Sequence, residues 1–252
     1  MSTRIALITG ANRGLGRSMA LHLAAAGVDV VGTYRQNREE AEAVAREIEA
    51  GGRRAAMLPL DVARSGTFAA FADALEGTLR ETFGRGDFDF LVNNAGVGIN
   101  ASVADTTEEQ FDEMVDVHLK GPFFLTQRLL PLMADGGRIL NVSTGLARFT
   151  SPGRAAYAAV KGGVEVLTRY MAQEFGPRGI TVNVIAPGAI ATDFGGGVVR
   201  DNPDVNRHIA SLTALGRVGQ ADDVGAAVAA LLSDGMGWMN GVRVEVSGGQ
   251  GL

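Results

Sequence analysis

The sequence of 252 residues contains no cysteine. This absence excludes disulfide bonds, thiolate zinc sites, iron–sulfur clusters and a cysteine nucleophile. Long apolar runs are also missing, because the longest unbroken one, Ala226–Leu232, is far shorter than the ~18 residues of a membrane span. The apolar stretch near the N-terminus, Ile5–Ile8, is too short for the ~7–15-residue core of a signal peptide. We therefore expect a cytoplasmic protein with no membrane partner.

A large excess of one charge is absent too. The chain has 23 Lys and Arg against 28 Asp and Glu, and its formal net charge is −5. This mildly acidic balance argues against a general affinity for nucleic acid. The few histidines have no metal-ligand spacing, so no catalytic metal is expected. Glycine is abundant instead: 35 residues, about 14% against a usual ~7%, indicate many tight turns or close backbone approaches.

Short apolar, β-branched runs alternate along the chain with longer segments of helical periodicity. Continuously apolar runs of this length are typical of strands buried on both faces. They lie at 5–8, 28–33, 55–60, 88–92, 138–142, 180–185 and 242–246. The helical segments lie at 15–26, 39–50, 67–83, 108–133, 155–175 and 222–232. This alternation predicts an α/β fold with a parallel sheet of about seven strands and helices on both faces. No linker, charge block or repeat divides the chain, so 1–252 is predicted to be one domain.

The segment from Gly188 to about Thr213 fits neither period. It contains three consecutive glycines, Gly195–Gly197, and the turn-forming run Asn202-Pro203-Asp204. A loop of this length inside a compact domain is usually functional or mobile. We interpret it as a substrate lid over about residues 188–213, with a plain surface excursion as the alternative.

A glycine-rich turn, Thr9-Gly10-Ala11-Asn12-Arg13-Gly14-Leu15-Gly16, follows the first predicted strand. Such a turn between a strand and a helix directs backbone N–H groups and the positive helix end at an anion. Gly10 permits the turn, and Gly14 and Gly16 allow a pyrophosphate to approach closely. The spacing matches neither G-x-G-x-x-G nor the P-loop. It favours a nucleotide phosphate site over a plain turn.

Four motifs, in this order, resemble those of the short-chain dehydrogenase/reductase family. They are T-G-x-x-x-G-x-G at 9–16, Asn93-Asn94-Ala95-Gly96, Tyr157-x-x-x-Lys161, and Ala186-Pro187-Gly188 with Thr192 four residues on. The resemblance covers essentially the whole chain. It implies a doubly wound, Rossmann-type sheet, a nicotinamide dinucleotide cofactor and subunit contacts near the C-terminus that build a homotetramer.

The end of the second strand bears on the choice between the two dinucleotides. An NAD site usually carries an acidic residue there, whereas an NADP site uses a basic one for the 2′-phosphate. Here Tyr34 stands at the acidic position, Arg35 follows it, and Arg13 lies in the glycine loop. Two guanidinium groups can bind a phosphate bidentately. We therefore predict NADP(H) over NAD(H); the alternative is that both arginines are solvated surface charges.

The resemblance also implies a set of cofactor contacts. Asp61 resembles the family's adenine-contacting residue, and a helix-capping role is its alternative. Asn94 is expected to act by position, and Thr192 either contacts the nicotinamide carboxamide or caps a short lid helix. The full set is Gly10, Asn12, Arg13, Gly14, Leu15, Gly16, Tyr34, Arg35, Asp61, Val62, Asn94, Ala95, Gly96, Tyr157, Lys161, Pro187, Gly188 and Thr192.

Tyr157 and Lys161 are four residues apart, so on a helix they share one face. A tyrosine has an ordinary pKa near ~10 and must fall by roughly three units to exchange protons near neutrality. A cation within ~4–6 Å typically lowers such a pKa by ~1–3 units. The resemblance implies that Tyr157 is the catalytic acid/base, and that Lys161 lowers its pKa and binds the nicotinamide ribose.

Two further catalytic positions depart from the family pattern. The family's serine, usually 13 residues before the tyrosine, is replaced by Thr144, which keeps the hydroxyl and adds a methyl group. A shift of one residue would give the role to Ser143. The family's helical asparagine is replaced by His118. Its imidazole either preserves the proton relay and adds a pH dependence, or is a satisfied buried histidine with the relay re-routed.

The substrate pocket is expected to be mostly apolar. It should draw on Thr144, Leu146, Phe149, Ala189 and Phe194. Core packing is the alternative for the large apolar members. The hypothesis is an NADP(H)-dependent oxidoreductase that interconverts a small-molecule ketone and a secondary alcohol, with 3-oxoacyl thioester reduction as one assignment. The alternative is a non-catalytic dinucleotide-binding sensor or scaffold on the same fold.

Overall fold

The computed structural model describes residues 3–252, and its centre is one parallel sheet of seven strands. The strand order is β3-β2-β1-β4-β5-β6-β7. The strands are β1 (Ile5–Ile8), β2 (Asp29–Tyr34), β3 (Ala55–Pro59), β4 (Phe88–Asn93), β5 (Met133–Val142), β6 (Thr181–Pro187) and β7 (Arg243–Val246). All neighbouring pairs are parallel. The predicted doubly wound α/β fold is confirmed.

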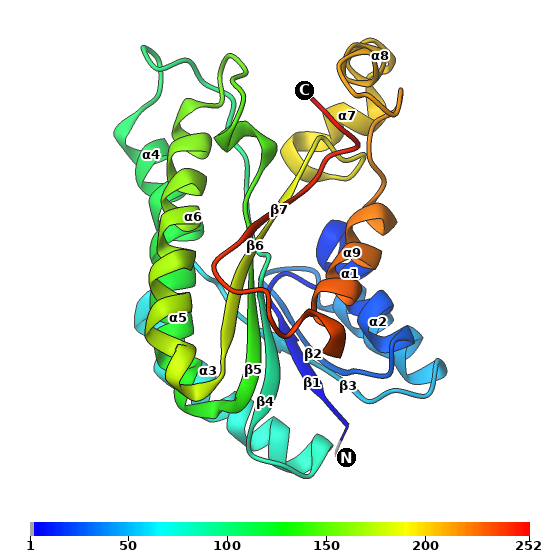
Figure 1. Cartoon of the computed structure of the whole chain (residues 1–252), viewed down its shortest axis with the longest axis vertical. Coiled ribbons are helices and arrows are strands. Elements are labelled where there is room, and N and C mark those ends of the chain that lie inside the picture. Colours follow the sequence, from blue (N-terminus) through cyan, green and yellow to red (C-terminus); the bar gives the residue numbers. More distant parts are fainter. Residues whose placement is uncertain (1–2) are drawn as a thin grey trace.

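Helices cover both faces of this sheet (Figure 1). One layer is formed by α1 (Gly14–Ala25), α2 (Arg38–Ala50) and α9 (Ala221–Leu231). The other contains α3 (Phe68–Thr78), α4 (Glu108–Val115), α5 (Gly121–Leu129) and α6 (Ala155–Phe175). The central strands alternate their apolar side chains between two separate cores: Ala6 and Ile8 face the first layer, and Ile5 and Leu7 the second. Burial on both faces explains their continuous hydrophobicity.

The segment predicted as one helix over 108–133 is broken. A π-helical turn at Asp116–Lys120 separates α4 from α5, and a 3₁₀ turn at Leu130–Leu132 precedes β5. Pro122 explains the first break, because it has no N–H to donate to the carbonyl four residues back, at His118. The Gly121 N–H donates to the Asp116 carbonyl instead, five residues back. His118 therefore lies in an irregular turn rather than in a regular helix.

The segment interpreted as a lid contains short helices that its pattern did not reveal. They are a 3₁₀ turn at Phe194–Gly197, α7 (Val198–Asp201) and α8 (Pro203–Ser211). Gly195, Gly196 and Gly197 all have positive φ angles, between 63° and 79°. The Asn202 side chain caps α8 by accepting from the backbone N–H groups of Asp204 and Val205. Within residues 3–252, every helix is too short or too polar to cross a bilayer.

Candidate active site

The predicted site residues come together at the carboxyl ends of β1, β4, β5 and β6. The strand order reverses between β1 and β4, and open α/β sheets bind ligands in the crevice at such a point. The glycine-rich turn joins β1 to α1 at this place. A Cβ at Gly16 would collide with the Gly10 carbonyl oxygen, so only glycine allows this approach.

Asn94 connects the end of β4 to the glycine turn. Its side-chain Nδ2 donates to the carbonyl oxygens of Thr9, at 2.8 Å, and Gly10, at 3.2 Å. The Thr9 hydroxyl accepts in turn from the backbone N–H groups of Asn94 and Ala95, at 2.9 and 3.0 Å. These bonds hold the turn against β4 and leave the N-terminus of α1 facing the crevice. The side-chain contacts of Asn94 are therefore with the glycine turn, and its orientation of the fourth strand and of the fourth-helix backbone stays a prediction.

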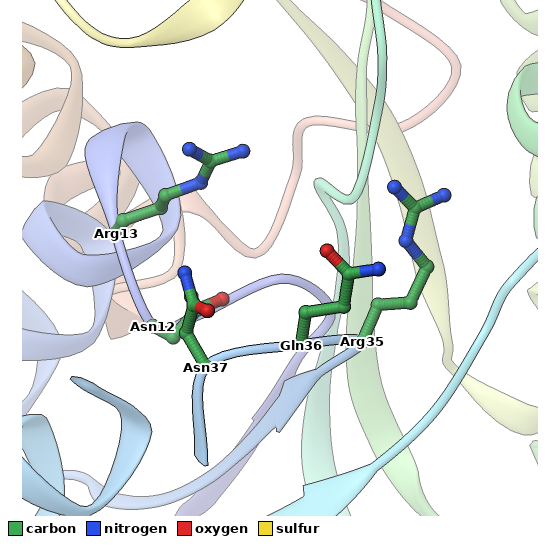
Figure 2. A pocket seen from close by; sticks show the side chains of 5 residues that line it. All are labelled: Asn12, Arg13, Arg35, Gln36 and Asn37. Carbon is green, nitrogen blue, oxygen red and sulfur yellow. The ribbon is translucent and has the colours of Figure 1, made fainter. Parts of the chain in front are cut away.

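A small pocket beside the glycine turn carries two positive charges. Its lining residues are Asn12, Arg13, Arg35, Gln36 and Asn37. Figure 2 shows the Arg13 and Arg35 side chains extending on either side of the shorter polar ones. Arg35 has no carboxylate partner among residues 3–252, whereas Arg13 lies 3.9 Å from the Asp193 carboxylate, a distance at the limit of an ion pair. The pocket therefore offers two guanidinium groups and amide donors to an anion.

Two pocket residues were not predicted from the sequence. Asn37 has a φ of 60°, a left-handed conformation that asparagine tolerates better than most residues. Asn37 is the residue directly before α2, and together with Gln36 it lines the pocket. The sequence did contain a signal for this turn, because the asparagine stands shortly after a strand and directly before α2.

Asp61 lies farther along the sheet edge, where its Oδ1 accepts from the Ala63 N–H at 3.1 Å.

Tyr157 and Lys161 share one face of α6, as their spacing predicts. The Lys161 Nζ is buried, donates to the Val142 carbonyl oxygen at 2.7 Å and lies 5.7 Å from the Tyr157 ring centre. Val142 is the last residue of β5, so the bond from Lys161 connects α6 to the end of this strand. Both residues are therefore carried by α6, and the lysine is also held by the end of β5.

Burial sets the protonation of both groups. It raises the pKa of Tyr157 above its ordinary value, although the side chain of Thr144 and the positive charge of Arg154 lower it. Burial also lowers the pKa of Lys161 to about 7. The direction for Tyr157 is opposite to the expected lowering by Lys161, because the loss of hydration outweighs the neighbouring groups. The tyrosine is a protonated hydroxyl at neutral pH and is available as an acid.

The structure distinguishes the two candidate hydroxyls at the end of β5. The Ser143 Oγ donates to the Glu165 Oε1 at 2.7 Å, and Glu165 also pairs with Arg243 at 2.7 Å. Ser143 is thus part of a buried polar link between β5, α6 and β7. The Thr144 hydroxyl instead accepts the Leu146 N–H at 3.2 Å, and the Thr144 side chain lowers the pKa of Tyr157. Thr144 is the hydroxyl on the tyrosine side.

His118 is buried and packs edge-on against Tyr157, with ring centres 5.1 Å apart. Its Nε2 lies 2.7 Å from the Val97 carbonyl oxygen and 3.4 Å from the Val97 backbone nitrogen, and the shorter contact favours the tautomer with a proton on Nε2. The other ring nitrogen, Nδ1, has no hydrogen-bond partner within residues 3–252. Burial, with the nearby charge of Lys161, lowers the pKa of His118 to about 2. The imidazole is therefore neutral, which argues against the titrating role.

The segment predicted as a lid begins beside the glycine turn and brings Phe194 against Tyr157. Thr192 lies beside Gly14, and its hydroxyl accepts the Phe194 N–H at 3.3 Å. The Phe194 ring centre is 5.8 Å from that of Tyr157, and a Cβ at Gly98 would come within 2.9 Å of the Phe194 ring. The Phe149 ring instead packs against Gly145 and Gly251. Phe194 therefore contacts the tyrosine, whereas Phe149 has packing contacts.

The remaining predicted residues lie around the same crevice. Ala95 and Gly96 follow β4, and Gly96 packs against the His118 ring. Pro187 ends β6 and Gly188 follows it. Leu15 is in the first turn of α1, Tyr34 ends β2, Val62 follows Asp61, and Leu146 is half-buried after Thr144. Within residues 3–252, no group of three or more His, Asp or Glu side chains is arranged to hold a metal ion.

A family model and curated relatives match nearly the whole chain. A family model described as enoyl-(acyl carrier protein) reductase matches residues 10–250. The 3-oxoacyl-[acyl-carrier-protein] reductase FabG of Staphylococcus aureus strain N315 is 36% identical over 250 residues, 98% of each chain.

Solved structures of reductases share the fold closely. The promiscuous reductase LugOII, which catalyses keto-reduction at C1 during lugdunomycin biosynthesis, is 39% identical with a TM-score of 0.93, over 98% of this chain and 97% of its own. The angucycline C-6 ketoreductase LanV with bound NADP is 38% identical with a TM-score of 0.93, over 98% of this chain and 95% of its own.

Proposed function

Because this chain belongs to the short-chain dehydrogenase/reductase family of oxidoreductases, we propose that it is an NADP(H)-dependent enzyme that interconverts a ketone and a secondary alcohol. The observation that carries this proposal is the grouping of Tyr157, Lys161 and Thr144 at the carboxyl ends of the strands. The ketoreductases among its relatives support a ketone as the reacting group. The apolar side chain of Phe194 above the tyrosine suits an apolar substrate.

In the proposed reaction, the residues of this chain supply the proton and stabilise the charge that develops on the carbonyl oxygen. Bound NADPH would supply the hydride to the carbonyl carbon. Tyr157 donates its hydroxyl proton to the carbonyl oxygen as negative charge develops there. The Thr144 hydroxyl donates a hydrogen bond to the same oxygen, and the Lys161 ammonium stabilises the tyrosinate that remains. His118, neutral and bonded to Val97, supports the Tyr157 ring from its edge.

The crevice fits a dinucleotide phosphate at two points. Gly10, Gly14 and Gly16 leave room where side chains would block the start of α1, which is an N-terminus that attracts anions. Arg13 and Arg35 line the neighbouring pocket, where they would hold the 2′-phosphate that distinguishes NADP from NAD. Thr192 and Pro187 lie at the other end, where the nicotinamide would be held.

Replacement of Arg35 by Ala is expected to raise the KM for NADPH about tenfold or more and to leave the KM for NADH nearly unchanged. A hydrogen bond to a charged group contributes about 1.5–3 kcal/mol, and ~1.4 kcal/mol is a factor of ten. Steady-state kinetics with both cofactors measure the effect. Arg38→Ala is the matched control, because Arg38 lies outside the pocket and pairs with Glu42. A wild-type preference for NADH would contradict the assignment.

Ketone reduction is expected to slow as the pH rises through about 7, the pKa of Lys161. Below this pKa the ammonium is charged and stabilises the tyrosinate; above it the charge is lost. A profile of kcat/KM over about pH 5 to 9 tests this. His118→Asn should leave the inflection in place, because His118 is neutral throughout this range. An inflection that disappears in His118→Asn would assign the titration to the histidine.

The choice among carbonyl substrates is open to a direct assay. NADPH oxidation is followed by absorbance with apolar ketones, a 3-oxoacyl thioester and an enoyl thioester. Turnover of a ketone or 3-oxoacyl compound is expected, and the enoyl thioester tests the reaction named by the family model. NADPH binding without turnover of any compound would contradict the proposal and favour a dinucleotide-binding sensor.

Further proposals concern assembly and organisation. A homotetramer is supported by large apolar side chains that are exposed on α4, α5 and α6. On a monomer, such exposed apolar groups often indicate an interaction surface. They are Phe111, Phe123, Phe124, Val166 and Tyr170. A single domain over 1–252, a lid over about 188–213, a cytoplasmic location and the lack of nucleic-acid partners stay predictions from the sequence.

A further inference from the structure

The last residues of the chain pair with residues 212–215, which lie at the end of the lid. We call Ser247–Gly251 the C-terminal strap. It runs antiparallel to the segment that leaves the lid, with a bridge between Thr213 and Gln250. The Leu215 N–H donates to the Gly248 carbonyl at 3.1 Å, and the Gly251 N–H donates to the Leu212 carbonyl at 3.0 Å. Figure 1 shows this end of the chain, in red, continuing from β7. The strap therefore holds the far end of the lid.

Arg148 fixes the strap to the loop that carries Thr144. Its guanidinium donates to the carbonyl oxygens of Gln250, at 2.9 Å, and Gly251, at 3.0 Å. The same group makes a bidentate pair with Glu245 of β7, at 2.8 and 2.9 Å. It also lies 5.5 Å from the centre of the Phe149 ring, which packs against Gly251. A bidentate, stacked arginine has a defined geometry. The backbone of Gln250 is thereby held in one place.

The Gln250 side chain points from this anchor to the turn after β6. Its Oε1 accepts the Ala189 N–H at 2.8 Å, and its side chain is only 8% exposed. The contact is close, because a Cβ at Gly188 would lie 2.8 Å from the same oxygen. The turn leads directly from Pro187 to Thr192, the residues assigned to the nicotinamide end of the site. Loss of Oε1 would leave a buried N–H without its partner.

We propose that Gln250 is a positioning residue for the nicotinamide end of the cofactor site. It acts by holding the Gly188–Ala189 backbone while Arg148 holds Gln250. This inference rests on the proposed NADP(H)-dependent function. The pocket assigned to the adenosine end, which contains Arg13 and Arg35, is lined by residues 12–13 and 35–37 and by none of the strap. A change at Gln250 should therefore affect one half of the cofactor site and spare the other.

The test compares three variants of the full chain. Gln250→Ala removes the acceptor, and Gln250→Glu keeps an oxygen at the same distance along the side chain. Deletion of Leu252 is the matched control, because this residue lies beyond the strap and is 94% exposed. Dissociation constants are measured by calorimetry for NADPH and for adenosine 2′,5′-bisphosphate, which occupies only the adenosine half. Turnover is measured per NADPH-binding site, so that a misfolded fraction does not count.

Gln250→Ala is expected to weaken NADPH binding or lower kcat by about tenfold, since displacements of an ångström cost up to ~10²-fold. The bisphosphate should bind as in the wild type, Gln250→Glu should restore most of the loss, and the Leu252 deletion should match the wild type. Unchanged NADPH binding and kcat in Gln250→Ala would overturn the proposal, as would equal weakening of both ligands or no rescue by Gln250→Glu. A wild type that binds NADPH but reduces no ketone would contradict the proposed function, and the binding comparison would still decide the role of Gln250.

Discussion

Replacement of Tyr157 by Phe is expected to lower kcat for ketone reduction by about 10³-fold or more. The change removes the one oxygen that donates the proton and leaves the ring contacts with His118 and Phe194 in place. General acid catalysis contributes about 10²–10⁴-fold, and burial keeps this tyrosine protonated at neutral pH. NADPH absorbance with a reducible ketone measures the loss.

The same helix provides a control for this experiment. Tyr170 lies on α6 and is 65% exposed, so Tyr170→Phe removes a hydroxyl from the same helix without touching the site. Tyr170→Phe should match the wild type in kcat and in NADPH affinity, so a loss confined to Tyr157→Phe is specific to the site. Activity of Tyr157→Phe within about tenfold of the wild type would assign the acid to another group.

Replacement of Thr144 by Ala is expected to lower kcat by about 10²–10³-fold. Loss of one donor to a developing oxyanion typically costs this much. Thr144 has its hydroxyl on the tyrosine side, whereas the neighbouring Ser143 hydroxyl is committed to Glu165 at 2.7 Å. Steady-state kinetics on Thr144→Ala, Thr144→Ser and Ser143→Ala provide the comparison.

The variants at these two positions have distinct expected outcomes. Thr144→Ser keeps the hydroxyl and should retain most activity. Ser143→Ala breaks the link to Glu165 and should lower the melting temperature, with kcat per folded enzyme close to that of the wild type. The opposite result, an active Thr144→Ala beside an inactive Ser143→Ala, would give the role to Ser143.

The sheet could be predicted because its signal is local. Each strand is a short apolar run, and burial on both faces makes the run continuous rather than alternating. The parallel arrangement of the strands followed from the βαβ alternation, and the doubly wound layout from the family resemblance; the strand order comes from the structure. Tyr157 and Lys161 were identified through the family resemblance, and their spacing of four residues explains why they share one face of α6.

The features that were missed depend on contacts between distant segments. Gln250 meets Ala189, 61 positions earlier, and no local pattern records such a pair. The pKa values of Tyr157 and His118 depend on burial by several elements. The neighbouring lysine alone predicted a lowered pKa for Tyr157, whereas burial raises it. The break at Asp116–Lys120 had a local cause in Pro122, which the helical periodicity around it concealed.

The most direct test of the central claim follows the hydride and the product together. Wild-type enzyme is supplied with NADPH deuterated at C4 of the nicotinamide and with a prochiral apolar ketone, and the product is examined by mass spectrometry and NMR. The account predicts a secondary alcohol with deuterium on the carbinol carbon, formed by the wild type and not by Tyr157→Phe. Recovery of unchanged ketone beside saturable NADPH binding, or equal deuterium transfer by Tyr157→Phe, would contradict it.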